Sequence, residues 1–410
     1  MRLPKLVPRL VATTMMACGS GVLAEPPAER SSATVNRYAP AQAVFDPSIA
    51  GRLKAPPGFT VTLFASGLEN PRMMEVGLDG TVYVTRRNND DVLALRDTDG
   101  DGTADEVNVF ASELDGVHGI ARRGSDLYLA SSTTVWKTPL GAAVPEVVIS
   151  DLPDGGQHPN RMVRFGPDGQ MYVSIGSSCN DCAEANQLER ATIIRYAPDG
   201  SGKHVVANGL RNTIGYDWNP HTQALWGMDH GSDFRGDFIP PEELNQIRDG
   251  ANYGWPICYG DGIVDDMTNA MPKMMALQPG QEQPTLQPLT RTDYCLQTEG
   301  ATLTTTAHSA PMAMRFYEGS EFPAEFRYDA FVSMRGSWNA GTPVGYTVVR
   351  VRFSQDGRPE GFEDFITGFI DEEGTLIYGR PVGIAFTPSG SLLVSDDTNG
   401  AVYLVRYQGE

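Results

Sequence analysis

Polar residues of a few types stand at one repeated place in this sequence, just before the first strand of successive repeated units. They are His158, Arg211, Asn212, His308 and Arg380. A histidine can accept a proton near neutral pH, and guanidinium groups stabilise neighbouring negative charge. Singly, such a side chain is as often a loop residue that caps backbone groups. Their shared position predicts instead a common site, where a proton is abstracted beside stabilised negative charge.

A second group of candidate residues lies in the segment 97–105, which reads Asp-Thr-Asp-Gly-Asp-Gly-Thr-Ala-Asp. The carboxylates are those of Asp97, Asp99, Asp101 and Asp105. Alternating carboxylates around glycines are typical of calcium loops. Asn108 stands where an EF-hand would have its bidentate glutamate, so the segment is not an EF-hand. We predict a structural Ca²⁺ site here; a solvated acidic turn is the alternative.

A third candidate is the glycine-rich turn at 228–237, which reads Met-Asp-His-Gly-Ser-Asp-Phe-Arg-Gly-Asp. Such a turn can offer backbone carbonyls to a hard cation. The pattern alone is equally compatible with an ordinary loop.

The elements that must position these residues recur six times from residue 58 onward. Each unit consists of strands of five to eight apolar or alternating residues, bounded by Gly, Asp or Pro. The third unit, for example, has predicted strands at 161–169, 170–175, 191–196 and 203–210. Four strands in each of six units predict an all-β fold, a six-bladed β-propeller of four-stranded blades. Residues before the innermost strands then lie at one mouth of its central channel.

The last unit contains only three strands, whereas an extra strand at 59–68 precedes the first unit. That extra strand ends Phe-Ala-Ser-Gly-Leu, and the fourth strand of the first unit ends Phe-Ala-Ser-Glu-Leu. We therefore predict that the N-terminal strand completes the last blade and removes the open seam of the ring. The propeller would occupy residues 58–410, after an extended arm at 25–57.

Two stretches interrupt the repeat, at 177–190 and 254–307, and each carries two cysteines. The pairs are Cys179 with Cys182 and Cys258 with Cys295. The simplest arrangement is one structural disulfide within each stretch. A redox or zinc pair is the alternative for the Cys-x-x-Cys motif, but no second Cys/His pair is near it in sequence.

The first 24 residues have the pattern of a secretory signal peptide. Arg2, Lys5 and Arg9 are followed by an apolar run and by Val-Leu-Ala before a cleavage site after Ala24. The apolar run is too short to span a bilayer, so no integral membrane segment is expected after processing. We predict a periplasmic or secreted protein; a lipoprotein anchored through Cys18 is the alternative. The net charge of −19 argues against a nucleic-acid partner, because phosphate contact requires a basic face.

Taken together, the motifs resemble those of the glucose/sorbosone dehydrogenase family, six-bladed propellers that use pyrroloquinoline quinone. The resemblance covers roughly residues 56–408. It is carried by the segments 157–158, 165–176, 209–212, 243–245, 252–256 and 379–381. The sorbosone dehydrogenase branch is closer, through the segments 178–182, 308–311, 336–339 and 395–397.

The resemblance implies roles for the catalytic residues. His158 matches the general base that takes the proton of the sugar C1 hydroxyl while hydride passes to the quinone. Arg211 matches the arginine that stabilises charge at the reacting quinone oxygens. Asn212 matches its cofactor-binding neighbour.

The resemblance also implies how the cofactor is held. Arg335 and Arg380 fall where the family places cations for the cofactor carboxylates, and His308 is expected among the cofactor-binding residues. A catalytic Ca²⁺ would bridge quinone and protein through carbonyls near Gly231 and Ser232.

Three positions depart from the family pattern. The glucose branch has an aspartate that orients the base, and this chain has Ser177 there. The carbonyl-donating Gly-Pro of that branch is Gly231-Ser232 here, and Ala340 replaces an arginine of the sorbosone branch.

The sequence therefore predicts oxidation of an aldose or a sugar-derived aldehyde by a pyrroloquinoline quinone enzyme. Ala183 follows Cys182, so there is no Cys-x-x-Cys-His haem motif at this position, and a separate electron acceptor, a cytochrome or a quinone, is expected. Two alternatives are a calcium-dependent lactonase on a similar propeller and a non-catalytic binding propeller.

Overall fold

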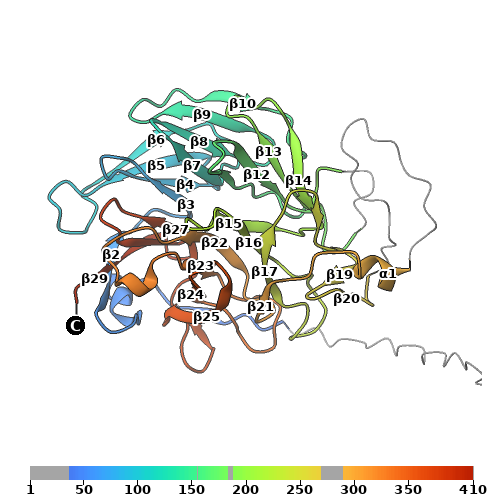
Figure 1. Ribbon diagram of the computed structural model, residues 1–410. Helices are drawn as coiled ribbons and strands as arrows, with labels where there is room; N and C mark the ends of the chain where they lie inside the picture. The colour runs from blue at the N-terminus through green and yellow to red at the C-terminus, as the bar shows by residue number, and fades with distance from the viewer. Residues whose placement is uncertain (1–36, 155, 183–187, 269–289, 410) are drawn as a thin grey trace, which may run out of the picture. The chain divides into compact units, whose positions relative to one another are not determined.

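Successive short strands pair into six antiparallel blades around a central axis, in the computed structural model of the chain (Figure 1). The structure describes residues 37–154, 156–182, 188–268 and 290–409, all within one unit, 33–410. The predicted signal peptide, Cys18 and part of the predicted arm lie outside the described residues. The predicted fold class, a six-bladed β-propeller, is confirmed.

Each blade contains four strands in order from the channel outward. Blade 1 is β3 (Pro71–Val76), β4 (Val82–Arg86), β5 (Asp91–Arg96) and β6 (Glu106–Ala111). Blade 2 is β7 (Gly119–Arg123), β8 (Asp126–Ala130), β9 (Val135–Pro139) and β10 (Glu146–Ile149). Blade 3 is β11 (Val163–Phe165), β12 (Met171–Ile175), β13 (Thr192–Tyr196) and β14 (His204–Asn208).

The remaining blades repeat this order with one change at each end of the set. Blade 4 is β15 (Thr213–Trp218), β16 (Leu225–Asp229), β17 (Glu242–Ile247) and β21 (Leu303–Thr305). Blade 5 is β22 (Pro311–Phe316), β23 (Ala330–Met334), β24 (Thr347–Phe353) and β25 (Pro359–Ile366). Blade 6 is β27 (Pro381–Phe386), β28 (Leu392–Asp396), β29 (Ala401–Tyr407) and β2 (Phe59–Ala65).

The second strand of a blade is buried along its length. All five residues are buried in each of β12, β16, β23 and β28. Such a strand has a neighbouring blade on both faces, so both faces are covered and the apolar run is nearly continuous. The outermost strands are more exposed, as in β6 and β10. The core therefore lies between blades and leaves the strand ends near the channel free to carry polar residues.

The N-terminal strand closes the last blade, as predicted. β2 pairs with β29 from Phe59 opposite Tyr407 to Ala65 opposite Val402. The Phe59 ring also contacts the rings of Phe322, Phe326 and Phe365, with centroids 4.8–5.2 Å away. Residues near the two ends of the described chain are therefore held in one sheet.

The long stretch predicted as an insert, 254–307, is only partly an insert. Its described part contains β19 (Cys258–Tyr259), β20 (Ile263–Val264) and α1 (Arg291–Cys295), and it ends in β21, the outer strand of blade 4. Just before it, β18 (Ala251–Asn252) adds a fifth, parallel strand to blade 3. Both predicted disulfides, Cys179–Cys182 and Cys258–Cys295, are present.

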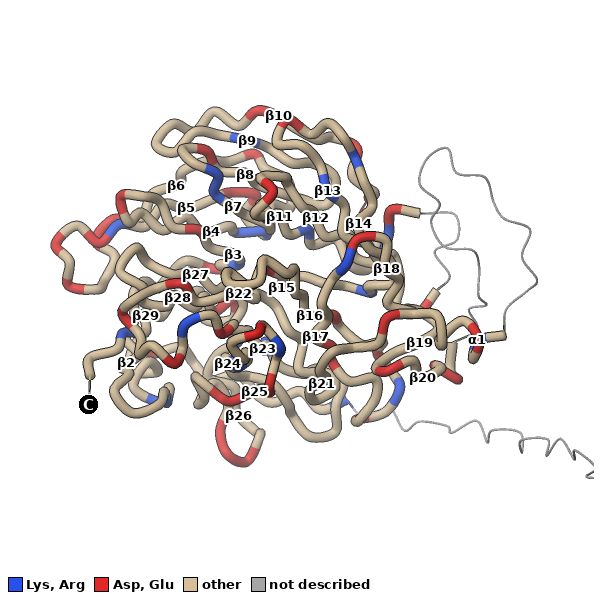
Figure 2. The backbone as a smooth tube through the Cα atoms, viewed as in Figure 1, with Lys and Arg blue, Asp and Glu red and all other residues tan. Residues whose placement is uncertain are grey.

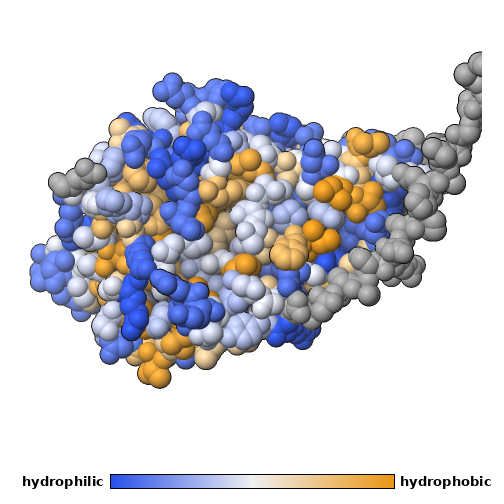
Figure 3. All heavy atoms as spheres, turned by 90° about the horizontal axis from the view of Figure 1, so that it is seen from below, coloured by the Kyte–Doolittle hydropathy of each residue, from blue (hydrophilic) through white to orange (hydrophobic). Residues whose placement is uncertain are grey.

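The described part of the predicted extended arm has some regular structure. β1 (Ala41–Gln42) pairs with β26 (Leu376–Ile377), and a short 3₁₀ helix spans Pro47–Arg52. No helix in the described ranges is long and apolar enough to cross a membrane. Acidic and basic residues are distributed over all blades (Figure 2), and hydrophilic residues interrupt the hydrophobic ones on the face seen in Figure 3.

Candidate active site

A pocket of about 280 Å³ lies where the loops before the inner strands converge. It is lined by six of the residues that the sequence predicted for the site: His158, Arg211, Asn212, Gly231, His308 and Arg335. His158 precedes β11, Arg211 and Asn212 precede β15, and His308 precedes β22. The propeller therefore brings together side chains from three successive blades that are up to 177 residues apart, from His158 to Arg335.

Gly176 allows two of these side chains to approach each other. A Cβ atom at Gly176 would lie 2.6 Å from the Cβ of His158 and 2.7 Å from Oδ1 of Asn212. Both distances are too short for non-bonded atoms, so only glycine fits between them. The glycine that ends β12 is therefore a condition for this arrangement.

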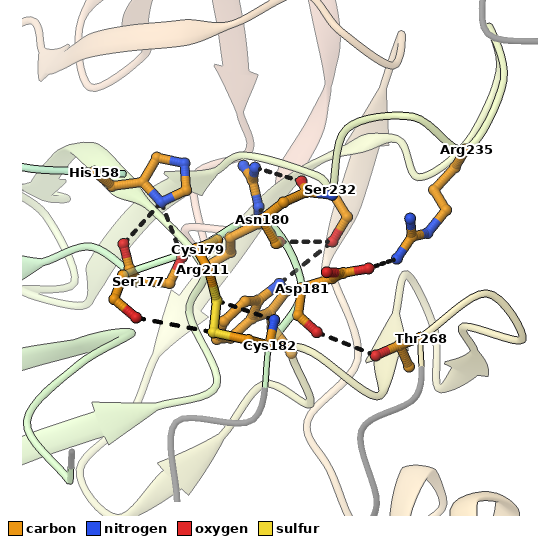
Figure 4. Close-up of a disulfide and its surroundings, with 12 residues drawn as sticks. His158, Ser177, Cys179, Asn180, Asp181, Cys182, Arg211, Ser232, Arg235 and Thr268 are labelled. Carbon is orange, nitrogen blue, oxygen red and sulfur yellow. Dashed lines mark hydrogen bonds and ion pairs between the residues drawn. A yellow bond between two sulfur atoms is a disulfide. The ribbon is translucent and has the colours of Figure 1, made fainter. Parts of the chain in front are cut away.

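The His158 ring is held through one of its two nitrogens (Figure 4). Its Nδ1 lies 3.0 Å from the carbonyl oxygen of Ser177 and 2.8 Å from Ser177 Oγ. The Ser177 hydroxyl donates to the carbonyl oxygen of Cys179 at 2.6 Å, so Oγ accepts from His158. Nδ1 therefore carries the proton, and Nε2 is left as the free base. The serine at the position of the family aspartate supplies two oxygens that orient the base.

The pKa of His158 lies far below its usual value, at about 3. Burial is the largest cause, and the positive charge of Arg211 lowers the pKa further. Burial also lowers the pKa of His230 to about 4, and its Nε2 faces the carbonyl oxygen of Pro311. Two pocket histidines are thus neutral at physiological pH.

Arg211 and Asn212 are positioned through their backbone by a buried carboxylate. Asp229 accepts hydrogen bonds from the N–H groups of both residues, each at 2.8 Å. The Arg211 guanidinium donates to Asn180 and, at 3.0 Å, to Asp233 Oδ2. It is only 3% exposed, so it presents its charge from a fixed place in the pocket wall.

The other cationic part of the pocket surrounds Asp397. Arg335 donates to its carboxylate at 2.9 Å, and Arg72, which also lines the pocket, bonds the same oxygen. Arg380 is not among the lining residues. Its Nη2 donates to the hydroxyl of Tyr346 at 3.0 Å, which places it behind the wall near Arg335. Three guanidinium groups therefore line the pocket, and a fourth lies behind them.

His308 and a buried glutamate complete the wall on the side of blades 4 and 5. His308 Nε2 lies 2.7 Å from the carbonyl oxygen of Gly236. Glu242 accepts from the N–H groups of Gly231 and Ala310, both at 3.0 Å, and burial raises its pKa to about 7.

Gly231 and Ser232, the predicted ligands of a catalytic cation, lie in different surroundings. Gly231 borders the main pocket, whereas both residues border a second cavity of only about 20 Å³. Asp229, Glu243 and Asp265 also line this small cavity. Burial is the largest cause of the raised pKa values of Asp229, about 6, and Glu243, about 8.

The predicted calcium loop is distant in sequence from the pocket residues, between β5 and β6, and its acidic positions are red in Figure 2. Ligand oxygens of Asp97, Asp99 and Asp105 lie within 4.8 Å of one another, so three of the four predicted residues converge. The carboxylate of Asp101 instead accepts from the N–H of Thr103 at 2.7 Å.

Several pocket residues were not predicted individually. They are Arg72, Asn160, His230, Asp233, Glu242, Trp338 and Asn339. His230 and Asp233 lie in the turn at 228–237, and Trp338 and Asn339 in the Gly-Ser-Trp-Asn motif, so those two motifs were the available signals. Arg72 gave a weaker signal, because it lies within the first inner strand instead of before it.

Known proteins share this architecture. A pyrroloquinoline quinone-dependent pyranose dehydrogenase from Coprinopsis cinerea is 22% identical over 403 residues, covering 85% of this chain and 54% of that enzyme. The chain thus spans about half the length of that relative. The holo form of the pyrroloquinoline quinone domain of the pyranose dehydrogenase from this organism superposes with a TM-score of 0.69 and 22% identity, covering 86% of this chain and 97% of the domain.

A second similar structure is the calcium structure of the Trichoderma reesei carbohydrate-active enzyme of family AA12. It superposes with a TM-score of 0.71 and 20% identity, covering 87% of this chain and 97% of the other. At these identities the superpositions show a shared fold. A family model described as TrAA12-like matches residues 53–408, nearly all of the described unit. The chain therefore belongs to the TrAA12-like family.

Proposed function

We propose that this protein is a pyrroloquinoline quinone-dependent dehydrogenase that oxidises an aldose or a sugar-derived aldehyde. The observation that carries the proposal is the pocket itself. It combines a neutral histidine, His158, whose Nε2 is free, with three guanidinium groups. The names of the Coprinopsis relative and of its holo domain support the choice of cofactor and of a sugar substrate.

The residues of the pocket suit a polyanionic quinone. Two buried polar atoms of lining residues, Arg72 Nε and Asn160 Oδ1, have no hydrogen-bond partner among the described residues. Unpaired buried polar groups are costly, so a ligand that pairs with them would be stabilised. Arg72, Arg335 and Asn212 would hold such a ligand, with Arg380 and His308 contributing from the wall behind. When bound, pyrroloquinoline quinone supplies the acceptor of two electrons.

His158 is proposed as the general base. Its Nε2 can take the proton of a sugar hydroxyl, because Nδ1 is already occupied by Ser177. The low pKa keeps the ring in the proton-accepting form. Arg211, fixed by Asn180 and Asp233, would stabilise negative charge that develops nearby.

Calcium is proposed at two places. One ion would bind beside the main pocket through the carbonyls of Gly231 and Ser232, and the other in the loop that holds Asp97, Asp99, Asp101 and Asp105. The convergence of three of these carboxylates and the calcium structure of the Trichoderma relative support the choice of ion. The physiological acceptor is proposed to be a separate cytochrome or quinone.

The test is a binding and activity titration of the mature protein. Pyrroloquinoline quinone is added with Ca²⁺, its binding is followed by quenching of intrinsic fluorescence, and dye reduction is measured with a panel of aldoses and aldehydes. We expect saturable binding, sugar-dependent dye reduction, and loss of this dye reduction when a chelator removes Ca²⁺. His158→Gln should bind the quinone but lose at least ~100-fold in kcat.

The matched control is His221→Gln, at an exposed histidine outside the pocket. It should keep full activity. Absence of quinone binding by the unmodified protein would rule out the proposal. Hydrolysis of lactones without quinone would favour a lactonase, and binding without any turnover a binding propeller.

A further inference from the structure

One short segment contacts both proposed catalytic groups. The residues 177–182, which we call the disulfide loop, contain the Cys179–Cys182 bond and lie between His158 and Arg211 (Figure 4). The loop follows Gly176 directly after β12, at the mouth of the channel. Its backbone and side-chain oxygens contact the two groups from different parts of the loop.

At its first end the loop orients the base. Ser177 accepts from His158 Nδ1 with both its carbonyl and its hydroxyl oxygen. The hydroxyl can act as acceptor because its own proton is donated to the carbonyl oxygen of Cys179, at 2.6 Å. The orientation of a cysteine peptide group therefore decides which nitrogen of His158 is free.

At its centre the loop orients the arginine. The carbonyl oxygen and Oδ1 of Asn180 accept from Nε and Nη2 of Arg211, each at 2.9 Å. Asn180 also exchanges two hydrogen bonds with the backbone of Asp233, at 2.7 and 3.1 Å. Asn180 stands between the two bonded cysteines, so its geometry depends on their bond.

We propose that the Cys179–Cys182 disulfide is a positioning device that fixes His158 and Arg211 together, and that its reduction by a dithiol releases both. Ser177 and Asn180 are the positioning residues through which it acts. The link to catalysis rests on the proposed function, whereas the link to side-chain geometry does not.

The two disulfides of the chain differ in their access to a reductant. Cys182 is exposed and Cys179 is partly exposed, whereas Cys258 and Cys295 are 4% and 2% exposed. A thiolate must reach a sulfur atom in order to attack it. A dithiol such as dithiothreitol would give two electrons and two protons to Cys179–Cys182. Two cysteine thiols form, and the reductant becomes a cyclic disulfide.

The first readout needs no cofactor. In protein with ¹⁵N-labelled histidine, the His158 signal, assigned with His158→Gln, should show one tautomer with the proton on Nδ1. After mild reduction and thiol alkylation, with mass spectrometry confirming labels at residues 179 and 182 only, we expect a mixture of tautomers. A ring that keeps the Nδ1–H tautomer after both thiols are labelled would overturn the proposal.

The second readout is quinone affinity. Reduced protein should bind pyrroloquinoline quinone at least tenfold more weakly at nearly unchanged melting temperature, and reoxidation should restore it. Cys179→Ser/Cys182→Ser should bind as the reduced protein does and should not respond to dithiothreitol. Unchanged affinity on verified reduction would contradict the proposal.

Two serine variants separate positioning from a general effect of the loop. Ser177→Ala removes one acceptor of His158 and should shift the tautomer ratio with the disulfide intact. Ser178→Ala changes the neighbouring hydroxyl and should leave the ratio unchanged. If the unmodified protein binds no quinone, the proposed function fails, yet the tautomer measurement still decides the positioning role.

Discussion

At the scale of single residues, the unusual feature of the site is a histidine oriented without a carboxylate. A carboxylate beside Nδ1 would raise the pKa of the ring. The neutral oxygens of Ser177 fix the tautomer without adding negative charge, and burial and Arg211 keep the pKa at about 3. The substitution of the family aspartate by Ser177 therefore keeps orientation and gives up charge.

The low pKa has a consequence for stability. In the unfolded chain His158 binds a proton below the ordinary histidine pKa of 6.5, whereas in the folded protein it stays neutral to about 3. Stability from this group is therefore complete above pH 6.5 and is lost as the pH falls through the window between the two values. At pH 4.5 we expect His158→Gln to be less destabilised than the unmodified protein, by on the order of 2 kcal/mol.

Denaturant unfolding at pH 7 and pH 4.5 measures this difference. His221→Gln, at an exposed ring, should follow the unmodified protein at both pH values. An equal acid-induced loss in the His158→Gln variant would mean that the native ring is protonated by pH 4.5.

The sequence predicted much of the site because polar residues before inner strands share one place in a propeller. His158, Arg211, Asn212 and His308 were found in this way, and the pocket contains all four. Arg72 was not, because it lies inside β3, where the ladder is irregular between Pro71 and Met74. An irregularity of this kind interrupts the alternation from which the facing of a side chain is predicted.

At the scale of elements, the end of β12 is the most constrained place in the site. Gly176→Ala should leave the blade folded, since the φ of Gly176 is not positive, but its new Cβ would push His158 and Asn212 apart. We expect quinone affinity to fall at least tenfold, measured by fluorescence quenching.

Gly361→Ala is the matched control for this prediction. A Cβ at Gly361, in β25, would meet nothing within 4 Å, and its φ is not positive either. Affinity should be unchanged and stability slightly higher, by about 0.5 kcal/mol. Unchanged affinity in Gly176→Ala would show that the close approach is not required.

Strand positions were predicted well where apolar runs are long, and less well where a strand is short. β21 has three residues and follows a long insert, so its Leu-Thr-Thr sequence gives no periodic signal. Its place is fixed by pairing with β17, a contact over a long sequence distance. The same holds for β18, which has two residues.

At the scale of the whole molecule, the ring depends on the pairing of β2 with β29. Phe59 lies at the start of β2 against four aromatic rings, so Phe59→Ala should remove packing from blades 5 and 6 at once. Because Phe59 is half-buried, we expect a loss of about 2–3 kcal/mol in the free energy of unfolding.

Thr62→Ala, at an exposed position of the same strand, is the control and should change stability by less than ~0.5 kcal/mol. Denaturant unfolding followed by circular dichroism measures both variants. Equal effects of the two substitutions would show that β2 is not held by its aromatic contacts.

The pairing of β2 with β29 also sets an order of events during biosynthesis. The Thr62 hydroxyl meets the backbone at Leu404, 342 residues further along the chain. The strand that emerges first from the ribosome must therefore wait, unpaired, for the strand made almost last. Until then its backbone groups and Phe59 are open to other partners, so a chaperone that shields nascent chains would find its main client segment there.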